Sequence, residues 1–192
     1  MKVETRLPYI KPEEMNEEQR KFYDFHLEAM KPMPYCWITE DKELNGPSNV
    51  MLHNPKIGNM LFPLNRAIIG NSIESVGGKI HELVILVVVA SAKAQYGIYA
   101  HTKLAQKVGL PDDKIAAITT CQRPSNLTKE EDIAYDLAIS LCQSGAISGI
   151  VYKRAVEAFG EKGVAALVFT VGMFKMIGTI LNAYNEPVPE NI

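Results

Sequence analysis

Two ionisable side chains in the middle of the chain, Glu82 and His101, have the spacing that a proton-transfer pair requires. Glu82 begins the apolar run ELVILVVVASA, and His101 follows it by nineteen residues at the end of AQYGIYAH. If the two segments form antiparallel helices joined near Ser91, the carboxylate and the imidazole lie opposite each other. A buried carboxylate beside an imidazole is typical of general acid–base chemistry. We therefore take His101 and Glu82 as candidate catalytic residues.

The same pair also has a structural interpretation, in which each side chain satisfies the buried polar atoms of the other. Spacing alone favours this second interpretation. Ala94, Gly97 and His101 fall within about 60° of one another on a helix, so small residues leave space beside the imidazole for a ligand or for another helix. Tyr96 lies on nearly the opposite face of an ideal helix, and it joins a site there only if the first turn is irregular.

Three further side chains are candidates for holding a substrate carboxylate, namely His81, Lys93 and Arg66, and the sequence does not choose among them. Tyr96 is a candidate hydrogen-bond donor. The four histidines show no metal-ligand spacing, so we expect neither a metal nor another cofactor. The three cysteines form no CxxC pair and show no local sign of activation.

The composition is that of a soluble globular protein, with 192 residues, 47% apolar residues and a net charge of −2. Because the sequence has no basic block, we expect neither nucleic acid nor an anionic membrane as a partner. The run ELVILVVVASA is too short to cross a bilayer, and the polar N-terminal stretch does not resemble a signal peptide. The sparse, odd number of cysteines fits a reducing compartment, so we expect a cytoplasmic protein.

Helix signals follow one another along the whole chain, and no strand pair stands out. In the first half we expect a helix over 17–30 capped by Asn16 and carrying an apolar stripe of Phe22, Phe25 and Ala29. A long loop over 31–49, a helix from 55 to 69 kinked at Pro63, and a turn near 70–79 follow.

The second half begins with two successive helices between 80 and 109 that break near 91–94. Their β-branched residues also suit a strand, but the helical spacing that follows decides against one. A short helix from Pro111, a helix capped by Thr128 and Glu131, and helices over 148–160 and 163–184 complete the chain. We therefore predict a single all-α domain over 1–192 with about eight helices, in which 1–45 is an N-terminal extension and loop.

The spacing Glu82, eleven residues, Ala94, two residues, Gly97, three residues, His101 resembles the active-site pattern of the carboxymuconolactone decarboxylase and alkylhydroperoxidase D superfamily. The flanking stretches HELVILVVVASA, AHTKLAQKVGLPDDKIAAI, GPSNVMLHNPKIGNML and LVFTVGMFKMIGTILNAYNEPVPE also resemble that family. The resemblance implies an alkylhydroperoxidase D-like helical bundle that assembles as a trimer, a hexamer or another homo-oligomer, a dimer included. Such assembly would also account for the last helix, whose apolar surface is too wide for one subunit to cover.

The sequence departs from the peroxidase branch of that family at the two positions where its CxxC cysteines stand, since Ala94 and Gly97 have no sulfur. Peroxide reduction needs an attacking thiolate and a resolving thiol, so the resemblance points instead to the decarboxylase branch. We expect a cofactor-free lyase or isomerase that acts on a small carboxylated or carbonyl-bearing molecule. In this scheme His101 is the acid or base, and Glu82 orients it. The alternative is a small-molecule-binding or assembly protein without chemistry, since fold does not fix function.

Overall fold

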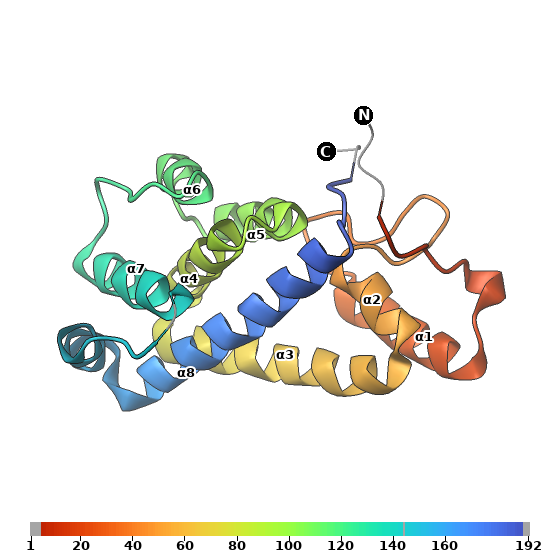
Figure 1. Ribbon diagram of the computed structural model, residues 1–192, viewed down its shortest axis with the longest axis horizontal. Coiled ribbons are helices and arrows are strands. Elements are labelled where there is room, and N and C mark those ends of the chain that lie inside the picture. Colours follow the sequence, from red (N-terminus) through yellow and green to blue (C-terminus); the bar gives the residue numbers. More distant parts are fainter. Residues whose placement is uncertain (1–4, 144, 190–192) are drawn as a thin grey trace.

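The computed structural model describes residues 5–143 and 145–189, and these residues form helices and loops without a β-strand, which confirms the all-α prediction. Only an isolated bridge pairs Ile38 with Leu44. A short 3-10 helix, Pro12–Glu14, precedes the α-helices (Figure 1). These are α1 Glu17–Met30, α2 Pro47–His53, α3 Pro55–Val76, α4 Gly78–Ser91, α5 Gln95–Lys107, α6 Asp112–Thr119, α7 Lys129–Cys142 and α8 Gly149–Ala183.

Helix α4 is the centre of the fold, and it contacts α3, α5, α6, α7 and α8. Every side chain from Ile80 to Ala90 is buried, so the helix has no solvent-facing stripe. A helix that is apolar on all sides must be enclosed by others. This enclosure overrides the β propensity of its valine and isoleucine residues, because tertiary packing contributes more than intrinsic preference.

Helix α8 runs along the length of the molecule beside α3 and α4, while α1 and α2 lie at one end and α6 and α7 at the other (Figure 1). Gly160 interrupts its helical geometry with φ 66° and ψ 170°, at the residue where the sequence predicts a helix end. By length and composition α8 is long and apolar enough to cross a membrane, and 56% of its most apolar window is buried within the fold. A core helix of a soluble protein shows the same properties, so they do not by themselves identify a membrane span.

Two predicted boundaries are wrong in the first half of the chain. Helix α2 begins at Pro47, inside the loop expected over 31–49, because Pro47 occupies the first helical position where its missing N–H costs nothing. Helix α3 continues through Pro63 to Val76, where a turn was expected from residue 70. The turn comes instead at Gly77, whose φ of 82° suits a glycine at the end of a helix.

Helix α1 buries a different stripe from the one expected. Phe22, His26 and Met30 point into the core, whereas Phe25 is 54% exposed. The i, i+4, i+8 row is therefore the packed one, and it carries a histidine that periodicity of apolar residues alone does not single out. The predicted cap at Asn16 is present, and it forms a capping box with Gln19.

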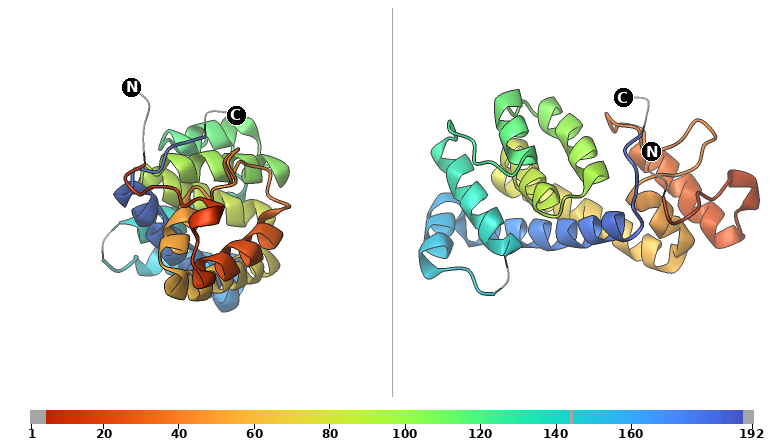
Figure 2. Two further views of the ribbon diagram at one scale, coloured as in Figure 1. Left: turned by 90° about the vertical axis from the view of Figure 1, so that its right-hand side faces the viewer. Right: turned by 45° about the horizontal axis from the view of Figure 1, so that its top comes forward.

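The segment that begins with the first described residues lies beside the C-terminal tail (Figure 2). The Arg6 N–H donates to the carbonyl of Tyr184 over 2.8 Å. The carboxylate of Glu186, which is buried, accepts from the Tyr9 hydroxyl at 2.8 Å and from the Gly46 N–H at 2.7 Å. Glu186 therefore joins the N-terminal segment, the start of α2 and the C-terminal tail.

One polar side chain of α4, His81, is buried against α3 with its Nδ1 2.9 Å from the hydroxyl of Ser72. Burial lowers the pKa of His81 to about 4. The ring is therefore neutral in the folded protein at pH 7 and remains so well below its ordinary pKa.

We predict that His81 lowers the stability of the protein in mild acid. The unfolded chain takes up a proton near the ordinary histidine pKa of about 6.5, whereas the folded protein does not until about 4, so the free energy of unfolding falls as the pH drops through this window. The change in the free energy of unfolding due to this histidine approaches about 1.4 kcal/mol per pH unit. Urea denaturation at several pH values between about 7 and 5 gives the free energy of unfolding at each pH. This free energy should fall less steeply with decreasing pH in the Ser72→Ala/His81→Leu double variant, which removes both hydrogen-bonding partners. Equal slopes in the two proteins would contradict the prediction.

Candidate functional site

A small cavity of about 100 Å³, partly open to solvent, lies between α1, the segment that leads into α2, and helices α2, α3, α5 and α8. Its volume falls between that of a single buried water and that of an engineered apolar cavity that binds benzene. Most of its wall is apolar, and a few polar side chains border it. These polar or aromatic polar residues are His26, Tyr35, Trp37, Ser48, Asn65, Arg66, Tyr96 and His101.

His101 borders this cavity from α5 and is held in place by Glu82 of α4. The distance from Nδ1 of His101 to Oε2 of Glu82 is 2.8 Å, and the two side chains are 13% and 8% exposed. The ring also stands edge-on to Phe174, with 4.9 Å between the ring centroids. Because a carboxylate accepts a hydrogen bond, Nδ1 carries the proton. In the neutral ring Nε2 then has the free lone pair, and no other described residue hydrogen-bonds to it.

The close approach of α4 and α5 brings the pair together as the sequence predicts. The chain turns between the two helices at Ala92 to Ala94, where Lys93 adopts a left-handed conformation with φ 55°. The N–H groups of Lys93 and Ala94 donate to carbonyl groups in the last turn of α4. A β-carbon at Gly97 would lie 3.0 Å from Cγ1 of Val89, so the glycine permits this helix packing.

Tyr96 also borders the cavity, although it lies about 140° around the helix from His101. Its long side chain extends from the first turn of α5 towards the segment before α2. The hydroxyl lies 2.8 Å from Oδ1 of Asn45 and 3.1 Å from the carbonyl of Cys36. A β-carbon at Gly46 would lie 2.4 Å from the Tyr96 ring. Tyr96 therefore anchors the segment that covers the cavity, and its hydroxyl is already occupied.

Arg66 borders the same cavity from an exposed position on α3. No carboxylate of the described residues forms an ion pair with its guanidinium. Tyr35 borders the cavity too, and burial together with the charge of Glu82 raises the pKa of its hydroxyl, while Arg66 acts in the opposite direction. The phenol therefore stays protonated at neutral pH. The segment over 31–49 therefore forms part of the cavity wall at His101.

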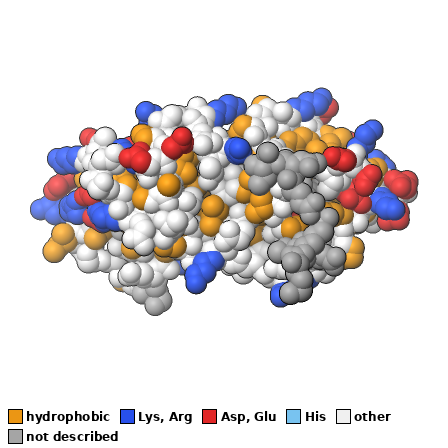
Figure 3. Space-filling model, turned by 90° about the horizontal axis from the view of Figure 1, so that it is seen from above, with side chains coloured by type: hydrophobic (Ala, Val, Ile, Leu, Met, Phe, Trp, Pro, Cys, Tyr) orange, Lys and Arg blue, Asp and Glu red, His pale blue; other side chains and the backbone are white. Residues whose placement is uncertain are grey.

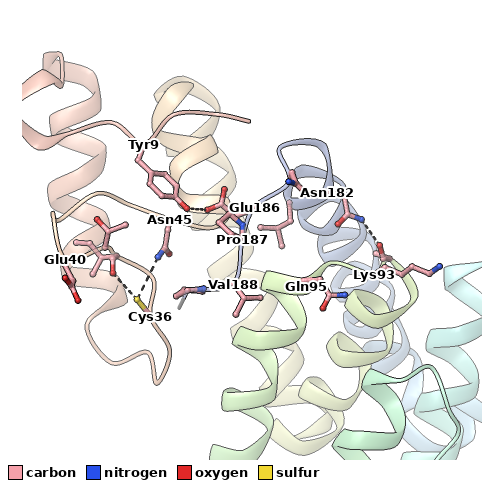
Figure 4. A pocket seen from close by; sticks show the side chains of 16 residues that line it. Tyr9, Cys36, Glu40, Asn45, Lys93, Gln95, Asn182, Glu186, Pro187 and Val188 are labelled. Atoms are coloured by element: carbon pink, nitrogen blue, oxygen red, sulfur yellow. Dashed lines mark hydrogen bonds between the residues drawn. The ribbon is translucent and has the colours of Figure 1, made fainter. Parts of the chain in front are cut away.

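Two of the candidate substrate-binding residues lie away from His101. His81 is turned towards Ser72 on α3 and does not border the cavity. Lys93 borders a second, larger cavity of about 1030 Å³, across which lie Tyr9 and Cys36 (Figure 4). Lys93 lies in the turn between α4 and α5, whereas Glu82 lies near the start of α4, so the two residues are at opposite ends of this helix pair.

His26 and Ser48 belong to the cavity wall, and neither was a candidate from the sequence. Nε2 of His26 lies 2.8 Å from the Ser48 hydroxyl, and both residues are buried. The one available signal was the spacing of His26 four residues after Phe22, which places a histidine on the packed face of α1. Nothing in the sequence places Ser48 beside it, because the contact joins two separate helices.

We predict that position 97 does not accept a side chain. Gly97→Ala should lower the free energy of unfolding by about 1–3 kcal/mol, because the added methyl group meets the buried, branched side chain of Val89. The matched control is Gly70→Ala on α3, where a β-carbon meets nothing within 4 Å and helix propensity favours alanine by up to about 1 kcal/mol. Chemical denaturation compares the two variants. An equal gain in stability at both positions would show that α4 and α5 are not in contact at Gly97.

No group of three or more histidine, cysteine, aspartate or glutamate side chains within 5–143 and 145–189 is placed to hold a metal ion. Comparisons of the chain with protein-family models, with curated protein sequences and with solved structures found no match. The function is therefore argued from the geometry around His101.

Proposed function

We propose that the protein is an acid–base enzyme that acts on a small carboxylated or carbonyl-bearing molecule at His101, by decarboxylation, isomerisation or a related lyase step. The observation that carries the proposal is the fixed geometry of His101. Its ring borders a cavity, Glu82 holds Nδ1 at 2.8 Å, and Nε2 has no partner among the described residues. A carboxylate that fixes the tautomer of a histidine leaves the second nitrogen ready to take or give a proton.

The cavity supplies the other requirements of such a reaction. Its mainly apolar wall, which includes Phe174 and Phe62, limits the number of water molecules beside His101 and so strengthens electrostatic interactions there. Arg66 can pair with a carboxylate at the exposed side of the cavity, and its forked guanidinium suits that group. Of the three candidates for this role, only Arg66 borders the same cavity as His101.

The chemistry that we propose uses no thiol and no cofactor. The three cysteines do not border the His101 cavity. Burial raises the pKa of the Cys142 thiol, which disfavours the reactive thiolate. Proton transfer by imidazole requires no redox group, so the side chains present are sufficient for it. The odd, sparse set of cysteines supports a cytoplasmic site of action.

We predict that His101→Gln lowers turnover by about 10²–10⁴-fold, the usual contribution of a general acid or base. The assay follows the loss of small carboxylated lactones and β-keto acids by NMR. Glu82→Gln should lower turnover less, because the amide keeps a hydrogen bond to the ring but loses the charge. The control variant is His53→Asn, which alters an exposed histidine outside the cavity. Unchanged turnover in His101→Gln would refute the catalytic role.

The alternative function is binding without chemistry, and it has support from the same cavity. Its wall is mainly apolar, and the ring of His101 is already satisfied on one side by Glu82 and packed on Phe174. A molecule that is held against His101 and recovered unchanged, under conditions where no substrate of the panel is consumed, would favour this alternative.

We also propose that the protein forms a homo-oligomer in which α8 contacts a second copy of the chain. The exposed face of this helix includes Ala165, Val168, Phe169, Gly172 and Met176, together with Thr179 and, at its margins, Lys162 and Lys175. The side chain of Phe169 is 63% exposed, the largest value among the large apolar residues of this face. Large apolar side chains on one face of a helix typically mark a protein contact. The face seen in Figure 3 carries acidic and basic side chains towards both ends, with hydrophobic side chains among and between them.

We predict that Phe169→Glu dissociates this oligomer while leaving the subunit folded, because a charge would be buried in the contact. Light scattering after size-exclusion chromatography should give a multiple of the 21.3 kDa chain mass for the wild type and a smaller mass for the variant. The control variant Lys129→Glu introduces a carboxylate at an exposed position in the first turn of α7 and should leave the mass unchanged. A monomeric wild-type protein would contradict the proposed assembly.

A further inference from the structure

Two tyrosine side chains, Tyr35 and Tyr96, border the cavity at His101. Tyr96 is the hydrogen-bond donor that the sequence suggests, but its hydroxyl is occupied by Asn45 and by the carbonyl of Cys36. The hydroxyl of Tyr35 has no hydrogen-bond partner within 5–143 and 145–189. Tyr35 is therefore the tyrosine whose hydroxyl is available to a molecule in the cavity.

An unpartnered polar atom binds a molecule only if that molecule can reach it. In the described chain, five side-chain atoms lack both a hydrogen-bond partner and accessible surface, and they include Nδ1 of His26 and Oδ1 of Asn65 in the same cavity wall. The hydroxyl of Tyr35 is not among these sealed atoms, although the residue is partly buried. This hydroxyl therefore keeps accessible surface.

The hydroxyl of Tyr35 is directed into the protein. Burial and the negative charge of Glu82 raise its pKa, and the positive charge of Arg66 acts in the opposite direction. A hydroxyl directed to bulk solvent would keep its hydration and would be screened from both charges. Its accessible surface therefore faces the cavity, which Tyr35, His101 and Arg66 all border.

Two tyrosines of α5 fix the backbone beside Tyr35. The N–H of Cys36 donates to the Tyr99 hydroxyl at 3.0 Å, and the Tyr96 hydroxyl lies 3.1 Å from the carbonyl of Cys36. The ring of Tyr35 also stands edge-on to that of Tyr99, with 6.4 Å between the ring centroids. These contacts hold the phenol against α5, the helix that carries His101.

We infer that Tyr35 donates a hydrogen bond to a carbonyl oxygen of the molecule on which His101 acts, and that this molecule is a small keto acid whose carboxylate pairs with Arg66. The inference rests on the proposed function and assigns each of these three side chains to one part of the substrate. The cavity volume of about 100 Å³ limits the buried part of that molecule to roughly a five-membered ring. The carboxylate then lies at the open side, where Arg66 is exposed.

A neutral phenol suits a reaction in which negative charge develops on the carbonyl oxygen. When Nε2 of His101 takes a proton from the carbon beside the carbonyl group, the electron pair of the C–H bond forms an enolate. The hydrogen bond from Tyr35 strengthens as this charge develops. Because the pKa of Tyr35 is raised, the phenol keeps its own proton. The proton on His101 then returns to another carbon of the enolate, which completes an isomerisation.

Two ligands test the inference, namely 3-oxocyclopentanecarboxylate and cyclopentanecarboxylate, which share the ring and the carboxylate and differ in the carbonyl group. We would titrate each into the full-length protein at neutral pH by calorimetry. Tyr35→Phe removes only the hydroxyl, so the preference for the keto acid should fall about tenfold, or about 1.4 kcal/mol. The control Tyr152→Phe, which alters an exposed residue of α8 outside the cavity, should keep that preference.

Arg66→Gln should weaken the binding of both ligands and leave their ratio unchanged. If Tyr35→Phe does not fold, the ¹³Cζ signal of Tyr35 in the wild-type protein decides, since it should shift with the keto acid and not with cyclopentanecarboxylate. An unchanged ratio in Tyr35→Phe, or a Tyr35 signal that responds equally to both ligands, would overturn the inference. The inference also fails if neither ligand binds. Turnover in the His101→Gln assay tests the proposed function separately, so that function can stand when the role of Tyr35 does not.

Discussion

The burial of α4 on every side is the constraint on which the rest of the structure depends. A helix enclosed by five others has no face on which a polar side chain can reach water, yet α4 carries a histidine and a glutamate in its first turns. Each must find a partner inside the protein, because an unpaired buried charge costs several kcal/mol. His81 meets Ser72 of α3 and Glu82 meets His101 of α5. Hydrogen bonds from His81 and Glu82 therefore fix the positions of α3 and α5 against α4, in addition to the packing of apolar side chains.

The N-terminal third of the chain turns this helix pair into a site. In the absence of α1 and the segment before α2, the His101 side of α5 would face solvent. Tyr96 and Glu186 hold the covering segment in place, the first by its hydroxyl on Asn45 and the second by the N–H of Gly46. Burial raises the pKa of the Glu186 carboxyl, whereas its hydrogen bonds to Gly46, Tyr9 and Thr5 act in the opposite direction. A buried carboxylate with three donors therefore anchors the segment before α2 to the C-terminal tail.

The sequence predicts those features that depend on local chemistry or on one helix pair. The capping residues at Asn16 and Thr128, the break after Ser91 and the pairing of Glu82 with His101 all follow from spacing along the chain. Features that depend on contacts between distant segments were missed. The pairing of His26 with Ser48 requires α1 to pack on α2, and the separation of Lys93 from His101 depends on a left-handed turn at a residue that rarely adopts one. The extension of α3 past residue 70 was missed for a related reason, since Gly70 is tolerated in a helix held by packing against α8.

The meaning of the small residues at positions 94 and 97 changes once the packing is known. On the sequence alone, alanine and glycine there leave room beside His101 for a ligand or for another helix. The structure fills most of that room with protein: Gly97 lies against Val89 and Leu181, and the methyl group of Ala94 lies close to Gly178. Gly97 therefore reaches the cavity only with its backbone, and position 94 does not reach it at all. The cavity at His101 extends from Gly97 and α8 towards α1, α2 and α3. The small residues at these two positions therefore let α4, α5 and α8 pack closely, while side chains of α1, α2 and α3 form the opposite wall of the cavity at His101.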